Sequence, residues 1–183
     1  DLMEKQNIYQ DISARTGGEI YLGVVGPVRS GKSTFIKRFM ELLVLPEIKD
    51  ENERKRTMDE LPQSGTGKMV MTTEPKFIPK EAAELPMEDM KIKIRLIDCV
   101  GFMIPGAGGN LENGQERLVK TPWFDYEVPF TKAAEFGTRK VIRDHSTIGI
   151  LVTADGSFGE IPRDSYVEAE KKTVAELNEI GKP

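Results

Sequence analysis

Few residues in this chain of 183 amino acids suit disulfide, metal-cluster or membrane chemistry. The sequence contains one cysteine, one histidine and one tryptophan. The single cysteine, Cys99, excludes a disulfide within the chain, and a lone histidine makes no metal site. No apolar run approaches the roughly 18 residues that indicate a membrane-spanning helix. The polar N-terminus shows no signal-peptide pattern. These absences predict an intracellular, cytoplasmic protein in a reducing compartment.

The chain also lacks an excess of positive charge. Its net charge is −4 and its isoelectric point is about 5.3. Because nucleic-acid binding needs clustered lysine and arginine, this balance argues against a nucleic-acid partner. Apolar residues make up 38% and charged residues 31% of the sequence. The composition and the length predict a globular domain with a core of its own.

The most informative stretch is GPVRSGKS, residues 26–33, which matches the phosphate-binding pattern G-x-x-x-x-G-K-[ST]. An apolar strand is expected at 19–25 and a helix from about 32 to 43, which is the context this loop requires. Its glycines let backbone N–H groups point at phosphate oxygens, and the helix N-terminus adds partial positive charge. Lys32 can reach the terminal phosphates, and Ser33 can ligate Mg²⁺. The predicted nucleotide-binding residues are Gly26, Pro27, Val28, Arg29, Ser30, Gly31, Lys32, Ser33, Thr34 and Gly101.

Two further stretches supply partners for this loop. Asp98 ends the apolar strand 91–98, and Gly101 follows it in the spacing D-x-x-G. We expect Asp98 to hold the Mg²⁺ shell and the Gly101 N–H to sense the γ-phosphate. Between the loop and Asp98, Thr72 or Thr73 is the candidate switch threonine that closes on the metal only in the triphosphate state. The predicted metal-binding residues are Ser33, Thr73 and Asp98.

Two residues depart from the usual pattern of switch GTPases. Phe102 follows Gly101 where many small GTPases carry a water-positioning glutamine, so slow turnover is expected. Arg29 lies within the phosphate loop, and we predict that it is an arginine finger supplied in cis. The alternative is that Arg29 points to solvent or pairs with a neighbouring carboxylate. The predicted catalytic residues are Arg29, Lys32, Thr72, Thr73 and Asp98.

The order of predicted elements is strand, helix, strand, strand, helix, strand, helix. This alternation predicts an α/β fold of the P-loop NTPase type, with a mostly parallel sheet and helices on both faces. We expect one domain over residues 1–183 that stops after the third core helix, so that later strands and C-terminal domains are absent. Its expected parts are a helical lead-in at 1–18, a long switch I region at 47–74, a short edge strand at 76–78, a long switch II loop at 102–130, a helix at 131–144, a buried strand at 147–153 and a helix at 164–180. Trp123 either packs the long loop down or meets a partner.

Four long stretches resemble one known family. They are GGEIYLGVVGPVRSGKSTFIKRFMELLVLP, DELPQSGTGKMVMTTEPKF, IRLIDCVG and AAEFGTRKVIRDHSTIGILVT. Together they resemble the N-terminal domain of the stage IV sporulation protein A family, over nearly the whole chain. That family is related to translation-factor GTPases, so the resemblance implies a translation-factor-GTPase-like fold. It matches Lys32 to the family's loop lysine, Thr72 and Thr73 to its sensor threonines, and Asp98 to its second acidic residue.

The resemblance, rather than the pattern of residues, implies the biological role. It implies Mg²⁺-dependent ATP hydrolysis linked to self-assembly of the basement layer of the bacterial spore coat. It further implies a location on the mother-cell face of the forespore outer membrane. A small amphipathic membrane-recognition peptide and other spore coat proteins are implied as partners through regions outside this chain.

The residues alone leave three functions open. The first is an ATPase that drives assembly, the second is a GTP-binding regulatory switch, and the third is a structural protein that binds nucleotide without useful turnover. The motif that reads the base would lie beyond Pro183, so this chain does not distinguish ATP from GTP. We favour the first function, because Lys32, Ser33, Thr73 and Asp98 make up a full set for Mg²⁺ and a triphosphate.

Overall fold

The computed structural model describes residues 11, 14, 16–62, 73–87, 90–108, 110–157 and 160–183, with the side chains of residues 87 and 90 left aside. Within the predicted lead-in helix, Asp11, Ala14 and Thr16 are helical, and the other residues up to 15 lie outside the described part. Among the described residues, no helix is long and apolar enough to cross a membrane.

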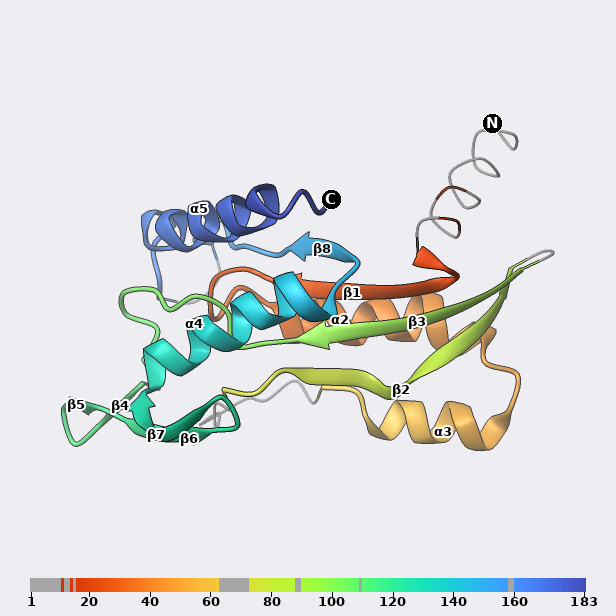
Figure 1. The fold of residues 1–183 in the computed structure, drawn as a ribbon, viewed down its shortest axis with the longest axis horizontal. Coiled ribbons are helices and arrows are strands. Elements are labelled where there is room, and N and C mark those ends of the chain that lie inside the picture. Colours follow the sequence, from red (N-terminus) through yellow and green to blue (C-terminus); the bar gives the residue numbers. More distant parts are fainter. Residues whose placement is uncertain are drawn as a thin grey trace.

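A four-stranded sheet forms the centre of the molecule (Figure 1). Its strands lie in the order β2, β3, β1, β8, with bounds Lys76–Met87, Met90–Asp98, Glu19–Val25 and Ile148–Leu151. β1 pairs in parallel with both β3 and β8, whereas β2 runs antiparallel to β3. The predicted mostly parallel sheet is therefore confirmed. Its parallel strands bring the carboxyl ends of β1 and β3 to one edge, where ligands bind in sheets of this kind.

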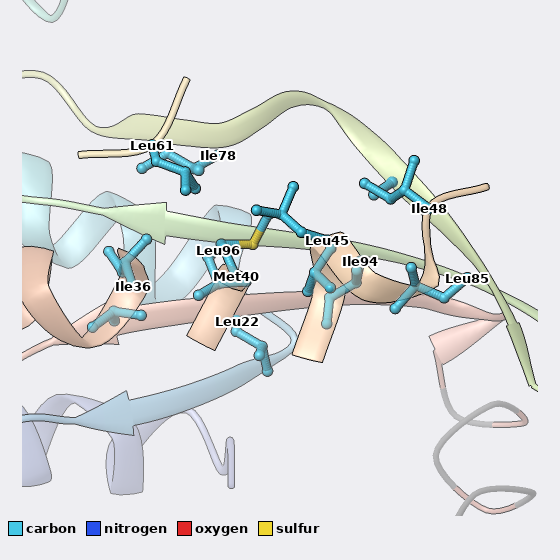
Figure 2. Packing of buried hydrophobic residues seen from close by; sticks show 13 residues of the cluster. Leu22, Ile36, Met40, Leu45, Ile48, Leu61, Ile78, Leu85, Ile94 and Leu96 are labelled. Atoms are coloured by element: carbon cyan, nitrogen blue, oxygen red, sulfur yellow. The ribbon is translucent and has the colours of Figure 1, made fainter. Parts of the chain in front are cut away.

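One face of the sheet packs against helix α2, Lys32–Phe39, and the π-helical segment Met40–Val44 that continues it. Side chains alternate along β1, so that Leu22 and Val24 point to this face. They meet Ile36 and Met40 in a cluster with no polar members, part of which Figure 2 shows. Burial of this cluster fixes α2, and with it the loop that precedes the helix.

The opposite face carries helix α4, Phe130–Lys140, its π-helical continuation Val141–His145, and helix α5, Asp164–Glu179. Val25 of β1 and Ile97 of β3 point to this side and pack with Val141 and Ile142. Arg139 and Arg143 form ion pairs with Glu176, and these link α4 to α5. The prediction of helices on both faces is therefore confirmed, and α4 and α5 match their predicted ranges to within a few residues.

Three predicted elements need correction. The edge strand expected at 76–78 continues to Met87, because β2 passes Pro79 through an irregularity in its pairing between Ile78 and Ala83. An edge strand tolerates such a break, since β2 has a hydrogen-bonding partner strand on only one side among the described residues. The strand expected at 147–153 is shorter than predicted and half-buried, because β8 lies at the other edge of the sheet among the described residues.

The third correction concerns residues 102–130, which we expected to form one long loop. They contain two hairpins, one of Leu111–Glu112 with Gln115–Glu116 (β4 and β5) and one of Leu118–Thr121 with Phe124–Pro129 (β6 and β7). The frequent glycine and proline of this stretch predicted a loop, because such residues favour turns, and here they occupy the turns between the strands.

The polar stretch 49–60 forms helix α3, Glu51–Asp59, whose first turn is capped by the Asp50 side chain.

Candidate nucleotide site

The segment between β1 and α2 has a curled backbone. Three of its residues have a positive φ: Gly26 at 139°, Arg29 at 57° and Gly31 at 94°. A Cβ on Gly26 would lie 2.1 Å from the Val152 carbonyl oxygen, so only glycine fits there. This backbone turns from the sheet edge into the N-terminus of α2, as a loop that surrounds an anion must do.

Lys32 lies inside this loop rather than in solvent. Its side chain is buried, and its Nζ donates a hydrogen bond of 2.6 Å to the Pro27 carbonyl oxygen. Burial lowers the pKa of Lys32, while the nearby Cys99 and Asp98 raise it. A phosphate oxygen would be a stronger, charge-assisted partner for this ammonium group than the neutral carbonyl. Lys32 is therefore positioned to bind an anion.

Ser33 and Asp98 meet directly beside this lysine. The Ser33 hydroxyl donates a hydrogen bond of 3.1 Å to Asp98 Oδ2. The parallel register sets Asp98 opposite Val24, next to the start of the loop. Burial raises the pKa of Asp98, whereas the Lys32 charge and the Ser33 hydrogen bond lower it. The structure thus brings together two of the three residues predicted to bind Mg²⁺.

Ser33 and Asp98 together offer two oxygen ligands, which suits magnesium better than a metal that takes all its ligands from the protein. No group of three or more His, Cys, Asp or Glu side chains gathers among the residues that the structure describes. Mg²⁺ commonly keeps water and phosphate oxygens as ligands and takes only one or two from the protein. A hydroxyl and a carboxylate oxygen fit that requirement, so Ser33 and Asp98 could hold the ion together with a nucleotide.

The segment after Asp98 is joined to the loop through its main chain. The Phe102 N–H donates to the Gly26 carbonyl oxygen at 3.2 Å, and the Val28 N–H donates to the Phe102 carbonyl oxygen at 3.0 Å. Gly101 is held so closely that a Cβ there would lie 2.1 Å from the Gly26 carbonyl oxygen and 2.9 Å from Lys32 Nζ. Gly101 therefore lies directly against both the loop and the lysine, and its role as a sensor of the γ-phosphate stays a prediction.

The Phe102 side chain has no access to a catalytic water. It is fully buried in a cluster that includes Val28, Phe130, Ala134 and Tyr166. From the sequence, Phe102 was predicted only as a residue that replaces a glutamine, and the pairing of its main chain with the loop was not predicted. An apolar residue directly after D-x-x-G was the available signal for such an anchor.

Arg29 is exposed, and its main chain and its side chain lie near different segments. Its carbonyl oxygen accepts a hydrogen bond of 3.4 Å from the Tyr166 hydroxyl of α5. A Cβ on Gly108 would lie at van der Waals distance from the Arg29 guanidinium. The backbone of Arg29 is thus tied to α5, while its side chain extends beside the segment that follows Phe102.

Thr73 is the predicted metal ligand that the structure does not join to the others. It is buried, and its carbonyl oxygen lies close to Gly137 of α4. Among the described residues, no hydrogen bond connects Thr73 with Ser33 or Asp98. Thr72, the alternative candidate, lies outside the described residues. Gly137 was not among the predicted residues, although a glycine inside a helical pattern is a recognised sign of close packing.

Comparison with known proteins identifies the family of this chain. The model of the family described as "Stage IV sporulation protein A, ATPase domain" matches residues 3–183. This chain belongs to that family. Stage IV sporulation protein A of Bacillus anthracis and that of Bacillus subtilis (strain 168) are each 56% identical to it over 182 residues. The protein of the same name from Clostridioides difficile (strain 630) is 56% identical over 178 residues.

The family match covers the whole candidate site, because the loop, Asp98 and Thr73 all fall within residues 3–183. The alignments cover 97–99% of this chain but only 36–37% of the length of the stage IV sporulation protein A relatives. This chain therefore corresponds to the ATPase domain of those longer proteins.

Proposed function

We propose that this chain is a Mg²⁺-dependent ATPase domain whose hydrolysis drives self-assembly of the basement layer of the bacterial spore coat. The observation that carries the chemical part is the Ser33–Asp98 hydrogen bond beside the buried Lys32, at the start of helix α2. Membership of the stage IV sporulation protein A ATPase-domain family supports the choice of ATP and of a sporulation role.

The residues of the site would act mainly by placing charge. Lys32, which now donates to the Pro27 carbonyl, would bind the terminal phosphates, and the curled loop and the α2 N-terminus would bind the rest of the polyphosphate. Ser33 and Asp98 would hold the metal, Ser33 through its hydroxyl oxygen and Asp98 through water. Magnesium, when bound, neutralises charge on the phosphates. Positioned charge of this kind supplies most of the catalysis in phosphoryl transfer.

The remaining parts of the proposal come from the resemblance to this family, and the family match and the similarity to the longer relatives support that resemblance. We propose that the protein is cytoplasmic and acts on the mother-cell face of the forespore outer membrane. Its proposed partners are further copies of itself and, through regions outside this chain, a small amphipathic membrane-recognition peptide and other spore coat proteins.

One observation favours a second function, in which nucleotide is bound without useful turnover. The Phe102 side chain is fully buried and its main chain pairs with the loop. A residue held in this way cannot orient water by its side chain. Catalysis would then depend on Thr73, on Arg29 or on backbone groups. If none of these supports hydrolysis, the nucleotide is a structural ligand.

Phosphate release by the full-length protein with Mg²⁺ and either ATP or GTP tests the proposal. We expect turnover with ATP and not with GTP, and its loss in the Asp98→Ala variant. Turnover with GTP alone would assign the protein to the regulatory switches. Absence of turnover with both nucleotides, together with retained binding, would support the structural alternative.

A further inference from the structure

Helix α4 contains a glycine where an ordinary helix would favour a residue with a side chain. A Cβ on Gly137 would lie 2.7 Å from the Thr73 carbonyl oxygen and 3.0 Å from the Trp123 ring. Glycine inside a helix costs about 1 kcal/mol relative to alanine. Its position is explained by space, because the backbone at Thr73 rests where the side chain would otherwise be.

Trp123 forms the second wall of this space. It lies in the turn between β6 and β7, and its ring packs on Phe136, one residue before Gly137, with centroids 5.2 Å apart. Phe124 also contacts Phe136, at 5.0 Å. The aromatic group is therefore fixed to the same helix as Gly137. Thr73 is only 8% exposed in this position.

This contact joins two segments that were predicted to respond to nucleotide. Thr73 belongs to the predicted switch I region, and the β6–β7 hairpin belongs to the predicted switch II region. In the seat formed by Gly137 and Trp123, Thr73 makes no hydrogen bond to Ser33 or Asp98 among the described residues. A switch threonine contributes to triphosphate binding only when its hydroxyl reaches the metal and the γ-phosphate.

We propose that Gly137 and Trp123 are positioning residues whose seat holds Thr73 away from the Ser33–Asp98 pair, and that triphosphate binding must draw Thr73 out of it. This inference rests on the proposed function. A protein whose binding-competent arrangement is only partly populated binds its ligand more weakly, by that fraction. The seat therefore lowers the affinity for ATP, and it leaves the affinity for ADP unchanged because ADP has no γ-phosphate for Thr73 to contact.

Filling the seat tests this directly. In the full-length protein, Gly137→Ala should lower the dissociation constant for MgATP by roughly threefold to tenfold and leave that for MgADP unchanged. The substitution suits a helix, so the variant is expected to fold. Thr131→Ala places the same residue on α4 without entering the seat, and we expect it to bind both nucleotides as the parent does.

A second substitution separates positioning from a general structural effect. When Thr73→Ala is added to Gly137→Ala, the gain in MgATP affinity should disappear, because the hydroxyl that benefits is gone. Equal MgATP affinity of Gly137→Ala and the parent, or weaker binding by the variant, would overturn the inference while leaving the proposed function intact. If the parent protein binds neither nucleotide, the proposed function fails and this inference fails with it.

Discussion

Arg29 illustrates how a single residue can carry both strain and charge. Its φ of 57° lies in the left-handed region, which costs an ordinary side chain about 1 kcal/mol or more. Glycine would adopt this backbone freely. The Tyr166 hydroxyl binds the Arg29 carbonyl and so helps to hold this conformation. Arg29 is exposed and lies beside the candidate phosphate site, so its guanidinium can supply positive charge that stabilises the transferring phosphoryl group.

We therefore predict that removing the guanidinium slows hydrolysis. Arg29→Ala and Arg29→Gly should each lower kcat by about 10³-fold, the smallest effect expected of an arginine finger, with little change in KM. Glycine also suits the positive φ, so a decrease in kcat that both variants share does not result from backbone strain. Steady-state ATPase assays on the two variants give the result. Turnover at the parent rate in either of them would exclude an arginine finger at this position.

Cys99 shows that proximity to the site does not make a residue chemically active. It follows Asp98 directly, yet its thiol is buried and makes a weak contact of 3.7 Å with the Val24 carbonyl oxygen. Burial raises its pKa to about 11. A thiol with this pKa is almost entirely protonated at neutral pH, which makes it a poor nucleophile. Its role is packing.

At the scale of elements, helix α2 transmits the packing of the core to the candidate site. Ile36 on its inner face and Met40 at the start of its π-helical continuation are fully buried in the cluster that includes Leu22 and Leu96. Lys32 and Ser33 are the first two residues of the same helix and follow the curled loop. The site is therefore held by a rigid element, and any loosening of α2 on the sheet should disturb the position of both side chains.

Truncation of one buried side chain measures this attachment. Ile36→Ala should lower the free energy of unfolding by about 3 kcal/mol, because it removes buried methylene groups and leaves a cavity. Urea denaturation followed by circular dichroism provides the value. Arg38→Ala lies on the exposed side of the same helix, and we expect it to change stability by no more than about 0.5 kcal/mol. Equal losses for the two variants would show that α2 is not anchored through Ile36.

The elements differ in how far the sequence predicts them. Apolar periodicity predicted strand β1 and helix α2, and the loop pattern between them agrees with both. Strand β3 was predictable because its apolar residues end at the D-x-x-G spacing. The hairpins at 111–129 were missed because their strands are short and mostly exposed, so no clear apolar alternation marks them. β2 was predicted too short because proline argues against a strand interior, while the actual strand lies at an edge.

For the molecule as a whole, nucleotide binding should appear as added stability. A ligand that binds only the folded state at about 100 times its dissociation constant stabilises that state by about 2.7 kcal/mol. For a domain of this size, such a gain raises the melting temperature by roughly 5 to 10 °C. We predict this shift with MgATP for the full-length protein and its absence in Lys32→Ala, because Lys32 is the buried cation of the loop.

Differential scanning fluorimetry with and without MgATP gives both melting temperatures, and the nucleotide-free melting temperature of Lys32→Ala shows whether the variant folds. An equal shift in the parent and in Lys32→Ala would place the nucleotide elsewhere on the protein. Chelation of Mg²⁺ should reduce the shift in the parent, since Ser33 and Asp98 are expected to act on the nucleotide through the metal.

The sequence by itself determined the chemistry that this protein can offer. The loop pattern, the acidic residue at the end of β3 and the succession of strands and helices are local features, and local propensity and spacing encode them. Family membership was also readable from the order of residues, since long stretches carry it.

Only the tertiary structure decided which of these residues meet. Ser33 and Asp98 are 65 positions apart in the chain, and they touch because β1 and β3 pair in parallel. Phe102 closes on the loop through main-chain hydrogen bonds, which its side chain does not predict, and Gly101 packs against the Gly26 carbonyl oxygen. Thr73 rests against Gly137 for a similar reason, since the space between two distant segments depends on how every element packs.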